Sequence, residues 1–414
     1  MPGVTPARLV AFNVVRRVFE QGAYADRALH GEARGLDRRD RAFATALAFG
    51  TVQRRGTLDW VIEVLARPVR QLDPAVVAAL RLGLFQLLFF DGVGRHAAVG
   101  ESVELAKAGS NGGHKLVNAV LRRVIREPVA LPGDVTPAAA AVTHSYPQWV
   151  VELWWERFGA EETRELLAAG NRPAELALRA NALVTDREAL AAALPVPTRP
   201  APDVPEGLVV EGPFDAHGHP LWVEGAFTPQ SRASMRVAHA VDPQPGERVL
   251  DLCAAPGGKT THLAALMGGE GEVVAVERHP GRARALQATV ERMRAASVRV
   301  EVSDAARPRG DGPFDRVLVD PPCSGLGTLQ GHPDVRWRAT PEGVEELAAR
   351  QERILETAVG SVRPGGRVVY STCTLVPREN EEVVAQAGVP VRRADLVLPH
   401  RDGTDGFLIA TLSA

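Results

Sequence analysis

One stretch of the chain decides the fold: Asp251-Leu252-Cys253-Ala254-Ala255-Pro256-Gly257-Gly258-Lys259-Thr260. It joins an apolar run to a helical pattern and therefore indicates a loop between a strand and a helix. Its small residues let the backbone approach a ligand closely, and the following helix offers its N-terminus to an anionic group. A phosphate-binding P-loop requires glycine where Cys253 stands, and the Gly-x-Gly-x-x-Gly pattern of a dinucleotide site is absent. The loop thus predicts a site for another ligand.

The same strand-loop-helix pattern recurs through residues 225–414. The expected strands are Arg248–Cys253, Glu272–Glu277, Val298–Val302, Arg316–Asp320 and Gly366–Ser371. The expected helices are Thr260–Met267, Gly281–Ala295, Pro341–Val362 and Arg378–Ala387. Alternation of this kind predicts a parallel, doubly wound α/β sheet of the Rossmann type. Because ligands bind such sheets beyond the carboxyl ends of the strands, the chemistry is expected there.

Two acidic residues follow the second and third of these strands. Glu277 ends the second strand, 20 residues after Gly257, where a carboxylate can accept hydrogen bonds from both hydroxyls of a ribose. Asp304 follows the third strand and can accept one from an adenine amino group. Taken singly, each is an ordinary surface acid. As a series, they are better explained by an adenosyl ligand.

The chain contains three cysteines, Cys253, Cys323 and Cys373, without a Cys-x-x-Cys pair. This usage argues against a disulfide framework and against a zinc site, so no metal is expected. A lone cysteine is usually a small buried hydrophobe, and Cys253 is expected to contribute only backbone and packing. Cys323 and Cys373 differ because they follow the fourth and fifth strands, within Asp320-Pro321-Pro322-Cys323 and Tyr370-Ser371-Thr372-Cys373.

The loop Asp251–Thr260 resembles the methionine-binding loop of RNA cytosine-5 methyltransferases, a family with a doubly wound methyltransferase fold. In that fold strands four and five are neighbours, which implies that Cys323 and Cys373 face the cofactor pocket. The resemblance implies S-adenosylmethionine as the cofactor. The residues implied to bind it are Cys253, Ala254, Ala255, Pro256, Gly257, Gly258, Lys259, Glu277, Asp304 and Asp320.

The chemistry of this family explains why cysteine is required. Carbon 5 of cytosine is a poor nucleophile, and addition of a thiolate at carbon 6 converts it into an enamine-like carbon that can accept a methyl group. In the family the Thr-Cys cysteine attacks and the Pro-Cys cysteine assists release, which implies these catalytic roles for Cys373 and Cys323. Asp320 can bind the cytosine edge and stabilise the additional proton of the adduct. DNA cytosine-5 methyltransferases use a Pro-Cys nucleophile, so the swapped assignment stays open.

The first third of the chain differs in charge and pattern. Residues 1–130 contain 19 Lys and Arg against 12 Asp and Glu, whereas the remainder contains 29 against 38. Apolar residues at helical spacing predict an all-α bundle with helices at Ala7–Phe19, Asp40–Val52, Leu58–Leu65, Pro74–Phe89, Val99–Ala108 and Lys115–Ile125. A Pro- and Gly-rich break begins at Pro128. We expect a helical domain over 1–132, a small α/β connecting subdomain over 133–224 and a catalytic domain over 225–414.

Four stretches of the helical domain resemble the RNA-binding antitermination fold NusB: Arg41–Asp59, Leu80–Leu88, Glu101–Lys107 and Lys115–Arg122. Fused to this catalytic domain, they resemble the bacterial 16S ribosomal RNA cytosine-5 methyltransferases of the B type (the RsmB, Sun or Fmu family). The resemblance implies RNA, most simply small-subunit ribosomal RNA, as the partner. Arg122, Arg123 and Arg126 are candidates for phosphate contacts, although a solvated basic face explains them equally well.

Further stretches fit the same family. Gly331–Trp337 fits its loop after the Pro-Cys motif, Pro377–Glu381 the segment after the nucleophile, and Asp402–Phe407 its C-terminal turn. One departure is Ser231, which stands after Gln230 where the family has an acidic residue. This puts any cofactor role of position 231 in doubt.

Three alternative functions remain at this point. A transfer RNA substrate cannot be separated from a ribosomal one by chemistry. A non-catalytic RNA-binding or antitermination protein is disfavoured because Cys373 and the Gly-Gly-Lys loop are intact. An exocyclic amino methyltransferase has an aromatic residue after Asp/Asn-Pro-Pro, where this chain has Cys323. No apolar run reaches the roughly 18 residues that span a bilayer, so a cytoplasmic protein without membrane contact is expected. We also expect the protein to be a monomer.

Overall fold

The computed structural model describes residues 3–109 and 112–413. It divides into two compact units. Unit 1 comprises the residues up to Arg172 together with Leu329–Arg338, and unit 2 comprises Pro173–Thr328 with the residues from Ala339 on. Within the described part of the chain, every helix is too short or too polar to cross a membrane.

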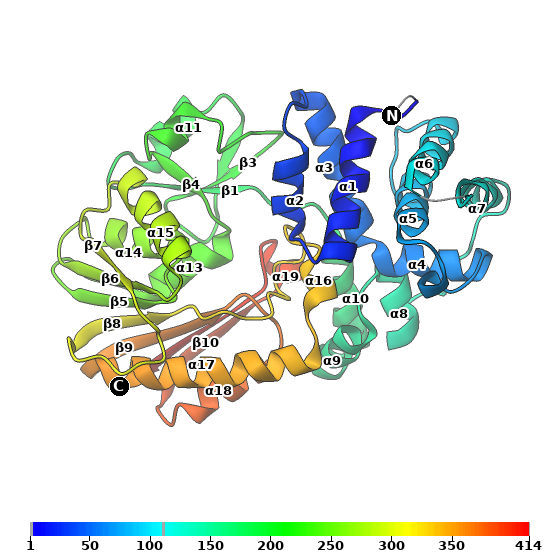
Figure 1. Ribbon diagram of the computed structural model, residues 1–414. Coiled ribbons are helices and arrows are strands. Elements are labelled where there is room, and N and C mark those ends of the chain that lie inside the picture. Colours follow the sequence, from blue (N-terminus) through cyan, green and yellow to red (C-terminus); the bar gives the residue numbers. More distant parts are fainter. Residues whose placement is uncertain (1–2, 110–111, 414) are drawn as a thin grey trace. The chain divides into compact units, whose positions relative to one another are not determined.

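Unit 1 is built from helices (Figure 1). They are α1 (Pro6–Gln21), α2 (Ala25–Glu32), α3 (Arg38–Gln53), α4 (Arg55–Leu65), η1 (Val69–Gln71), α5 (Pro74–Leu88), α6 (Arg95–Gly109), α7 (His114–Arg126), α8 (Pro137–His144), α9 (Gln148–Phe158), α10 (Ala160–Ala169) and α16 (Val335–Arg338). The predicted all-α bundle is confirmed. Helix α2 was not predicted, because its eight residues offer barely two turns in which periodicity can appear.

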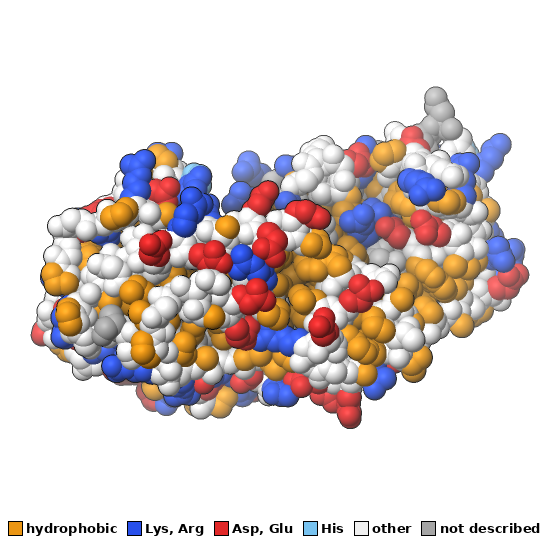
Figure 2. Space-filling view, turned by 90° about the horizontal axis from the view of Figure 1, so that it is seen from below, with side chains coloured by type: hydrophobic (Ala, Val, Ile, Leu, Met, Phe, Trp, Pro, Cys, Tyr) orange, Lys and Arg blue, Asp and Glu red, His pale blue; other side chains and the backbone are white. Residues whose placement is uncertain are grey.

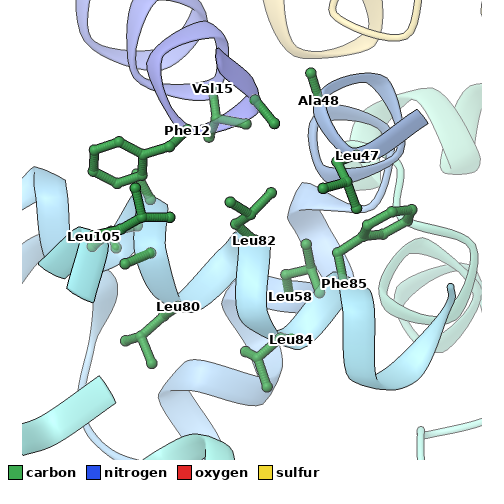
Figure 3. Packing of buried hydrophobic residues seen from close by; sticks show 14 of the residues in the cluster. Phe12, Val15, Leu47, Ala48, Leu58, Leu80, Leu82, Leu84, Phe85 and Leu105 are labelled. Carbon is green, nitrogen blue, oxygen red and sulfur yellow. The ribbon is translucent and has the colours of Figure 1, made fainter. Parts of the chain in front are cut away.

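Helix α5 is the central element of this bundle. Twelve of its 15 residues are buried, because a helix that is apolar all round must be covered on every side. Figure 3 shows Leu82 of α5 in the same cluster as Val15 of α1 and Leu47 of α3. The helix begins after Asp73, whose carboxylate accepts from the backbone N–H of Ala75 at 2.8 Å. This N-cap is what the Asp-Pro pair indicates.

The segment Leu329–Arg338 belongs to unit 1 although its neighbours in sequence belong to unit 2. Arg336 is completely buried and donates to the carbonyl oxygens of Ser145 at 2.9 Å and Gly170 at 3.2 Å. The indole N–H of Trp337 donates to the carbonyl oxygen of Val52 at 2.7 Å. Buried polar groups of this kind require their partners, so the segment is held firmly among the helices.

The smaller sheet of unit 2 is antiparallel, with the order β2-β3-β1-β4. Its elements are β1 (Ala177–Ala180), α11 (Arg187–Ala193), β2 (Thr198–Pro200), β3 (Gly207–Val210), α12 (Pro220–Val223) and β4 (Phe227–Pro229). Residues 133–224, expected as one subdomain, therefore contribute helices to unit 1 and strands to unit 2. Strand β4, which completes this sheet, lies beyond the expected limit at 224. The domain limits at 132 and 224 stay predictions.

The larger sheet has seven strands in the order β10-β11-β9-β8-β5-β6-β7. They are β5 (Arg248–Leu252), β6 (Glu272–Glu277), β7 (Val298–Val302), β8 (Phe314–Val319), β9 (Val362–Thr372), β10 (Val391–Val397) and β11 (Phe407–Ser413). Strands β5 to β9 pair in parallel, which confirms the predicted doubly wound sheet. The antiparallel strands β10 and β11 were not predicted. Six of the seven residues of β10 are exposed or only half-buried, so it lacks an apolar run.

Helices cover both faces of this sheet (Figure 1). They are α13 (Arg232–Val241), α14 (Gly258–Leu266), α15 (Pro280–Arg292), α17 (Pro341–Ser361), η2 (Pro377–Glu379), α18 (Glu381–Gln386) and α19 (Pro399–Asp402). Successive residues of β5 alternate between two cores, Val249 facing α13–α15 and Leu250 facing α17 and α18. This burial on both faces explains the continuous apolar runs, and it leaves the strand ends free for a site.

Candidate active site

The loop after β5 is closed by a short hydrogen bond. The hydroxyl of Thr260 donates to a carboxylate oxygen of Asp251 at 2.6 Å, linking the start of α14 to the end of the strand. Between them Cys253 and Gly257 take the left-handed conformation, with φ of 69° and 105°. Burial raises the pKa of Asp251 to about 7 and that of the Cys253 thiol to about 12. Cys253 is therefore a neutral packing group, while the loop turns the chain towards Lys259.

Lys259 and Asp320 form the charged centre of the site. The ammonium of Lys259 lies 2.7 Å from one carboxylate oxygen of Asp320, and the hydroxyl of Ser371 donates to the other at 3.2 Å. Burial lowers the pKa of Lys259, but the neighbouring carboxylate of Asp320 outweighs it, so the pKa is raised overall. The carboxylate of Asp320 is thus held by contacts with Lys259, after β5, and Ser371, near the end of β9. These contacts orient it to accept hydrogen bonds from a ligand.

The two later cysteines lie beside each other at the ends of β8 and β9. These strands are adjacent and parallel, and the sulfur atoms of Cys323 and Cys373 are 3.3 Å apart. The hydrogen bond with Cys373, together with burial, raises the pKa of Cys323 well above that of a free thiol. Lys259 interacts electrostatically with Cys373. The site therefore pairs a thiol that stays protonated with one beside an ammonium group.

Further hydrogen bonds tie the two cysteine loops together. The backbone N–H of Gly327 donates to the carbonyl oxygen of Cys373 at 2.9 Å, and the hydroxyls of Ser324 and Thr374 are 2.7 Å apart. Glu379 is completely buried and accepts from the backbone N–H of Ser324 at 2.8 Å. Burial raises the pKa of Glu379. The relative position of the two sulfur atoms is thus set by backbone contacts.

We expect a methyl group added at Gly327 to disturb this arrangement. A Cβ there would lie 2.0 Å from the carbonyl oxygen of Gly406 and 2.9 Å from that of Cys373, too close for either backbone to stay in place. Because a misplacement of about 1 Å can cost about 100-fold in rate, Gly327→Ala should lower kcat for methyl transfer by about that factor. The control is Gly360→Ala, where a Cβ would meet nothing within 4 Å. Equal rates in both variants would contradict the expectation.

The loops surround a cavity of about 220 Å³. The lining includes the predicted site residues Cys253, Ala255, Lys259, Glu277, Asp320, Cys323 and Cys373. Ala254, Pro256, Gly257 and Gly258 lie in the same loop without lining the cavity, and Asp304 lies next to Ala305, which does. The roles of all these residues stay predictions.

Glu277 suits the expected adenosyl group. Its side chain is buried at the carboxyl end of β6, accepts from the backbone N–H of His279 at 2.8 Å and lies 3.3 Å from Arg282. A carboxylate has about four acceptor positions, so these two contacts leave capacity for the hydroxyls of a ribose. The donor set of the cavity therefore fits S-adenosylmethionine.

Comparison with known proteins gives the family. Residues 238–393 match the family model described as 16S rRNA methyltransferase RsmB/F, residues 5–126 match the NusB family, and residues 146–217 match the RsmF/B-like ferredoxin-like domain. The probable ribosomal RNA small subunit methyltransferase B of Synechocystis is 37% identical, over 98% of this chain and 99% of its own. The chain belongs to the RsmB/F family. The corresponding Bacillus subtilis protein is 32% identical, over 99% and 98% of the two chains.

Solved structures agree with this membership. The crystal structure of PH0851 is 27% identical, with a TM-score of 0.85 over 99% of both chains. A methyltransferase homologue from Pyrococcus horikoshii, also 27% identical, has a TM-score of 0.60 over 67% of this chain and 98% of its own. The resemblance inferred from the loop and the Pro-Cys and Thr-Cys motifs is thereby confirmed, and the protein is a methyltransferase of the RsmB/F family.

Several residues that line the cavity of this RsmB/F protein were missed from the sequence. They are Arg278, His279 and Arg282, just after β6, and Arg350, in the middle of α17. The first three could have been found, because they follow the strand end where a ligand is expected. Arg350 carries no such signal, since it lies within a helix and far in sequence from any strand end. Together these residues add three arginines and a histidine to the lining of the cavity.

Charges elsewhere are mixed. Figure 2 shows acidic and basic side chains intermingled on one face. Within unit 2, Arg378 donates to Glu345 and Glu352, each at 2.8 Å, so this arginine is already paired. In unit 1, Arg122 and Arg126 are exposed on α7 and line a shallow pocket of about 280 Å³. The lining of this pocket also includes Glu104 and the apolar residues Val99, Val103 and Ile125.

Proposed function

We propose that the chain transfers a methyl group to carbon 5 of a cytidine in 16S ribosomal RNA through a transient thioether to Cys373. The observation that carries the proposal is the placement of the Cys373 and Cys323 sulfur atoms 3.3 Å apart in one cavity with the Lys259–Asp320 pair. A methyltransferase acting on an exocyclic amino group has no use for two thiols there. Methylation at carbon 5 needs a nucleophile and a group that assists its release.

Cys373 is the better placed nucleophile. A thiolate is the reactive form of cysteine, and the ammonium of Lys259 interacts electrostatically with Cys373. Its sulfur adds to carbon 6 of the cytosine, which breaks the double bond between carbons 5 and 6 and leaves carbon 5 electron-rich. Glu277 and the loop after β5 would hold S-adenosylmethionine, which would supply the methyl group to carbon 5. Asp320, fixed by Lys259 and Ser371, accepts hydrogen bonds from the cytosine edge.

Release requires transfer of the carbon 5 proton to a base, either water or the carboxylate of Asp320 in the same cavity. The electron pair of that C–H bond then reforms the ring double bond as the bond between sulfur and carbon 6 breaks. Cys323 lies beside Cys373 and keeps its proton because its pKa is raised by the hydrogen bond to Cys373 and by burial. A neutral thiol at hydrogen-bond distance can donate to the departing sulfur of Cys373. The protonated state of Cys323 and its contact with Cys373 therefore support Cys373 as the attacking residue and Cys323 as the one that assists release.

The RNA assignment is supported by the family and by unit 1. The relatives from Synechocystis and Bacillus subtilis are both called probable ribosomal RNA small subunit methyltransferase B. Residues 5–126 match the NusB family and present Arg122, Arg123 and Arg126 on an exposed side of α7. Phosphate contacts of this kind position RNA, and the target cytosine must leave its stack to reach the thiols.

The test is identification of the methylated nucleoside. Purified protein is incubated with 16S ribosomal RNA or transfer RNA and S-adenosylmethionine labelled in the methyl group, and the RNA is digested to nucleosides. We expect the label in 5-methylcytidine and only from ribosomal RNA. Label in N4-methylcytidine would contradict the cysteine chemistry. Label in transfer RNA alone would overturn the assignment of the substrate.

A further inference from the structure

A second cluster of reactive side chains lies in unit 2 outside the cavity of the two cysteines. It consists of Glu206, just before β3, His239 on α13 and His262 on α14. A carboxylate oxygen of Glu206 lies 3.0 Å from Nε2 of His239 and 2.5 Å from Nε2 of His262. The three ligand atoms all lie within 4.8 Å of one another. Three elements far apart in the sequence thus bring two imidazoles and a carboxylate to one point.

His262 is the unusual member of this cluster. Its side chain is 1% exposed, and neither ring nitrogen is placed for a well-directed hydrogen bond to a described residue, although Nε2 lies 2.5 Å from a carboxylate oxygen of Glu206. Buried polar groups nearly always have partners, and an exception suggests a bound water or ion. The Nε2 atom faces Glu206 and the ring of His239, which stands at 85° to its own. An ion between the three side chains would occupy this nitrogen.

We propose that Glu206, His239 and His262 bind a divalent transition-metal ion, with Zn²⁺ as the ion that the donor set fits best. Two imidazole nitrogens and one carboxylate form a recognised zinc ligand set, with water in the fourth position. Ca²⁺ and Mg²⁺ prefer sites made of several oxygen ligands, and one carboxylate does not supply them. The cysteine pattern predicted no metal, and this site uses none of the three cysteines.

One member of the cluster reaches a cavity. His239 lines a space of about 540 Å³ together with Asp203, Asp242, Arg236, Arg367, Arg392 and Arg393, whereas Glu206 and His262 do not line it. One cation, Arg179, also lies near Glu206, but its guanidinium donates to Gln230 at 2.8 Å and to Thr261 at 2.9 Å. Glu206 contacts the two imidazoles directly, with Nε2 of His239 at 3.0 and 3.1 Å from its two oxygens, so a bound ion would replace these contacts.

The ion would have a structural role. It would join the turn before β3, in the smaller sheet, to two helices that cover the larger sheet. His262 lies three residues after Lys259 on α14. Binding at His262 would hold that helix against the smaller sheet without touching the reacting groups. The proposal therefore does not depend on the reaction proposed above.

The experiment uses the full chain without a histidine tag, stripped with a chelator and dialysed. Zn²⁺ is titrated by calorimetry, and Co²⁺ is added to a second sample because its visible absorption bands report tetrahedral coordination. We expect one ion per chain and a higher Tm with Zn²⁺. Failure of the wild-type chain to bind either ion would overturn the proposal, whatever its methyl-transfer activity.

Variants then assign the ligands. Glu206→Gln keeps the shape of the side chain, and His239 is partly exposed, so Glu206→Gln and His239→Gln should both fold; their Tm without metal checks this. Each should weaken Zn²⁺ binding by more than about 100-fold, since even residues that only support a ligand contribute 10–100-fold. The control is His217→Gln, an exposed histidine in the same unit that should bind as the wild type does. Unchanged binding in both ligand variants would show that the ion binds elsewhere and overturn the proposal.

Discussion

Replacement of Cys373 by alanine is expected to abolish methyl transfer while leaving S-adenosylmethionine binding nearly intact. The sulfur lies in the cavity beside Cys323, whereas the groups expected to hold the adenosyl moiety lie at the ends of β5 and β6. Without the thiol no addition to carbon 6 is possible, and carbon 5 stays a poor nucleophile. Loss of a covalent nucleophile lowers kcat by more than about 10⁴-fold in well-studied enzymes, and a loss of that size is expected here.

Two measurements check this expectation together. Single-turnover methylation of 16S ribosomal RNA gives the loss of rate, and calorimetric titration with S-adenosylmethionine shows whether the cofactor site survives. The matched control is Cys253→Ala, because Cys253 is a second cysteine of the cavity whose thiol stays neutral by burial. It should keep most of the activity. A Cys373→Ala enzyme with wild-type rate would rule out the covalent mechanism.

Replacement of Cys323 by alanine is expected to trap the enzyme on its RNA. Cys323 is the nearest thiol to the proposed nucleophile, at 3.3 Å, and its raised pKa keeps it protonated. Without this donor the bond between the Cys373 sulfur and carbon 6 should break slowly, and a thioether survives denaturation. The variant should therefore accumulate as a slow-migrating protein–RNA band on a denaturing gel.

The double variant Cys323→Ala/Cys373→Ala supplies the control for that band. It should show none, because the nucleophile itself is missing. A trapped band in Cys373→Ala and not in Cys323→Ala would mean that the two cysteines exchange roles, as in the DNA cytosine-5 enzymes. The gel thus shows directly which of the two adjacent thiols forms the bond to carbon 6.

Much of the larger sheet could be predicted from local pattern. Strands such as β5 and β6 are buried on both faces, so they appear as continuous apolar runs with a turn after each. The loop Asp251–Thr260 could also be predicted from neighbouring residues alone. Its small residues and glycines allow the tight turn that joins the strand before it to the helix after it. Strand β10 was missed because it is exposed and charged and shows no such run. Strand β11 was missed although it begins with a buried apolar run, Phe407–Ala410.

The sequence by itself determined the doubly wound sheet, the helical bundle and the two Pro-Cys and Thr-Cys motifs, because each depends on residues close together in the chain. Only the tertiary structure decided what depends on register between distant segments. The 3.3 Å between the Cys323 and Cys373 sulfur atoms follows from the pairing of β8 with β9. The meeting of Glu206 with His239 and His262 follows from helix packing against the smaller sheet. Such contacts join residues whose spacing in the chain carries no period, so strand pairing and side-chain packing between distant segments set them.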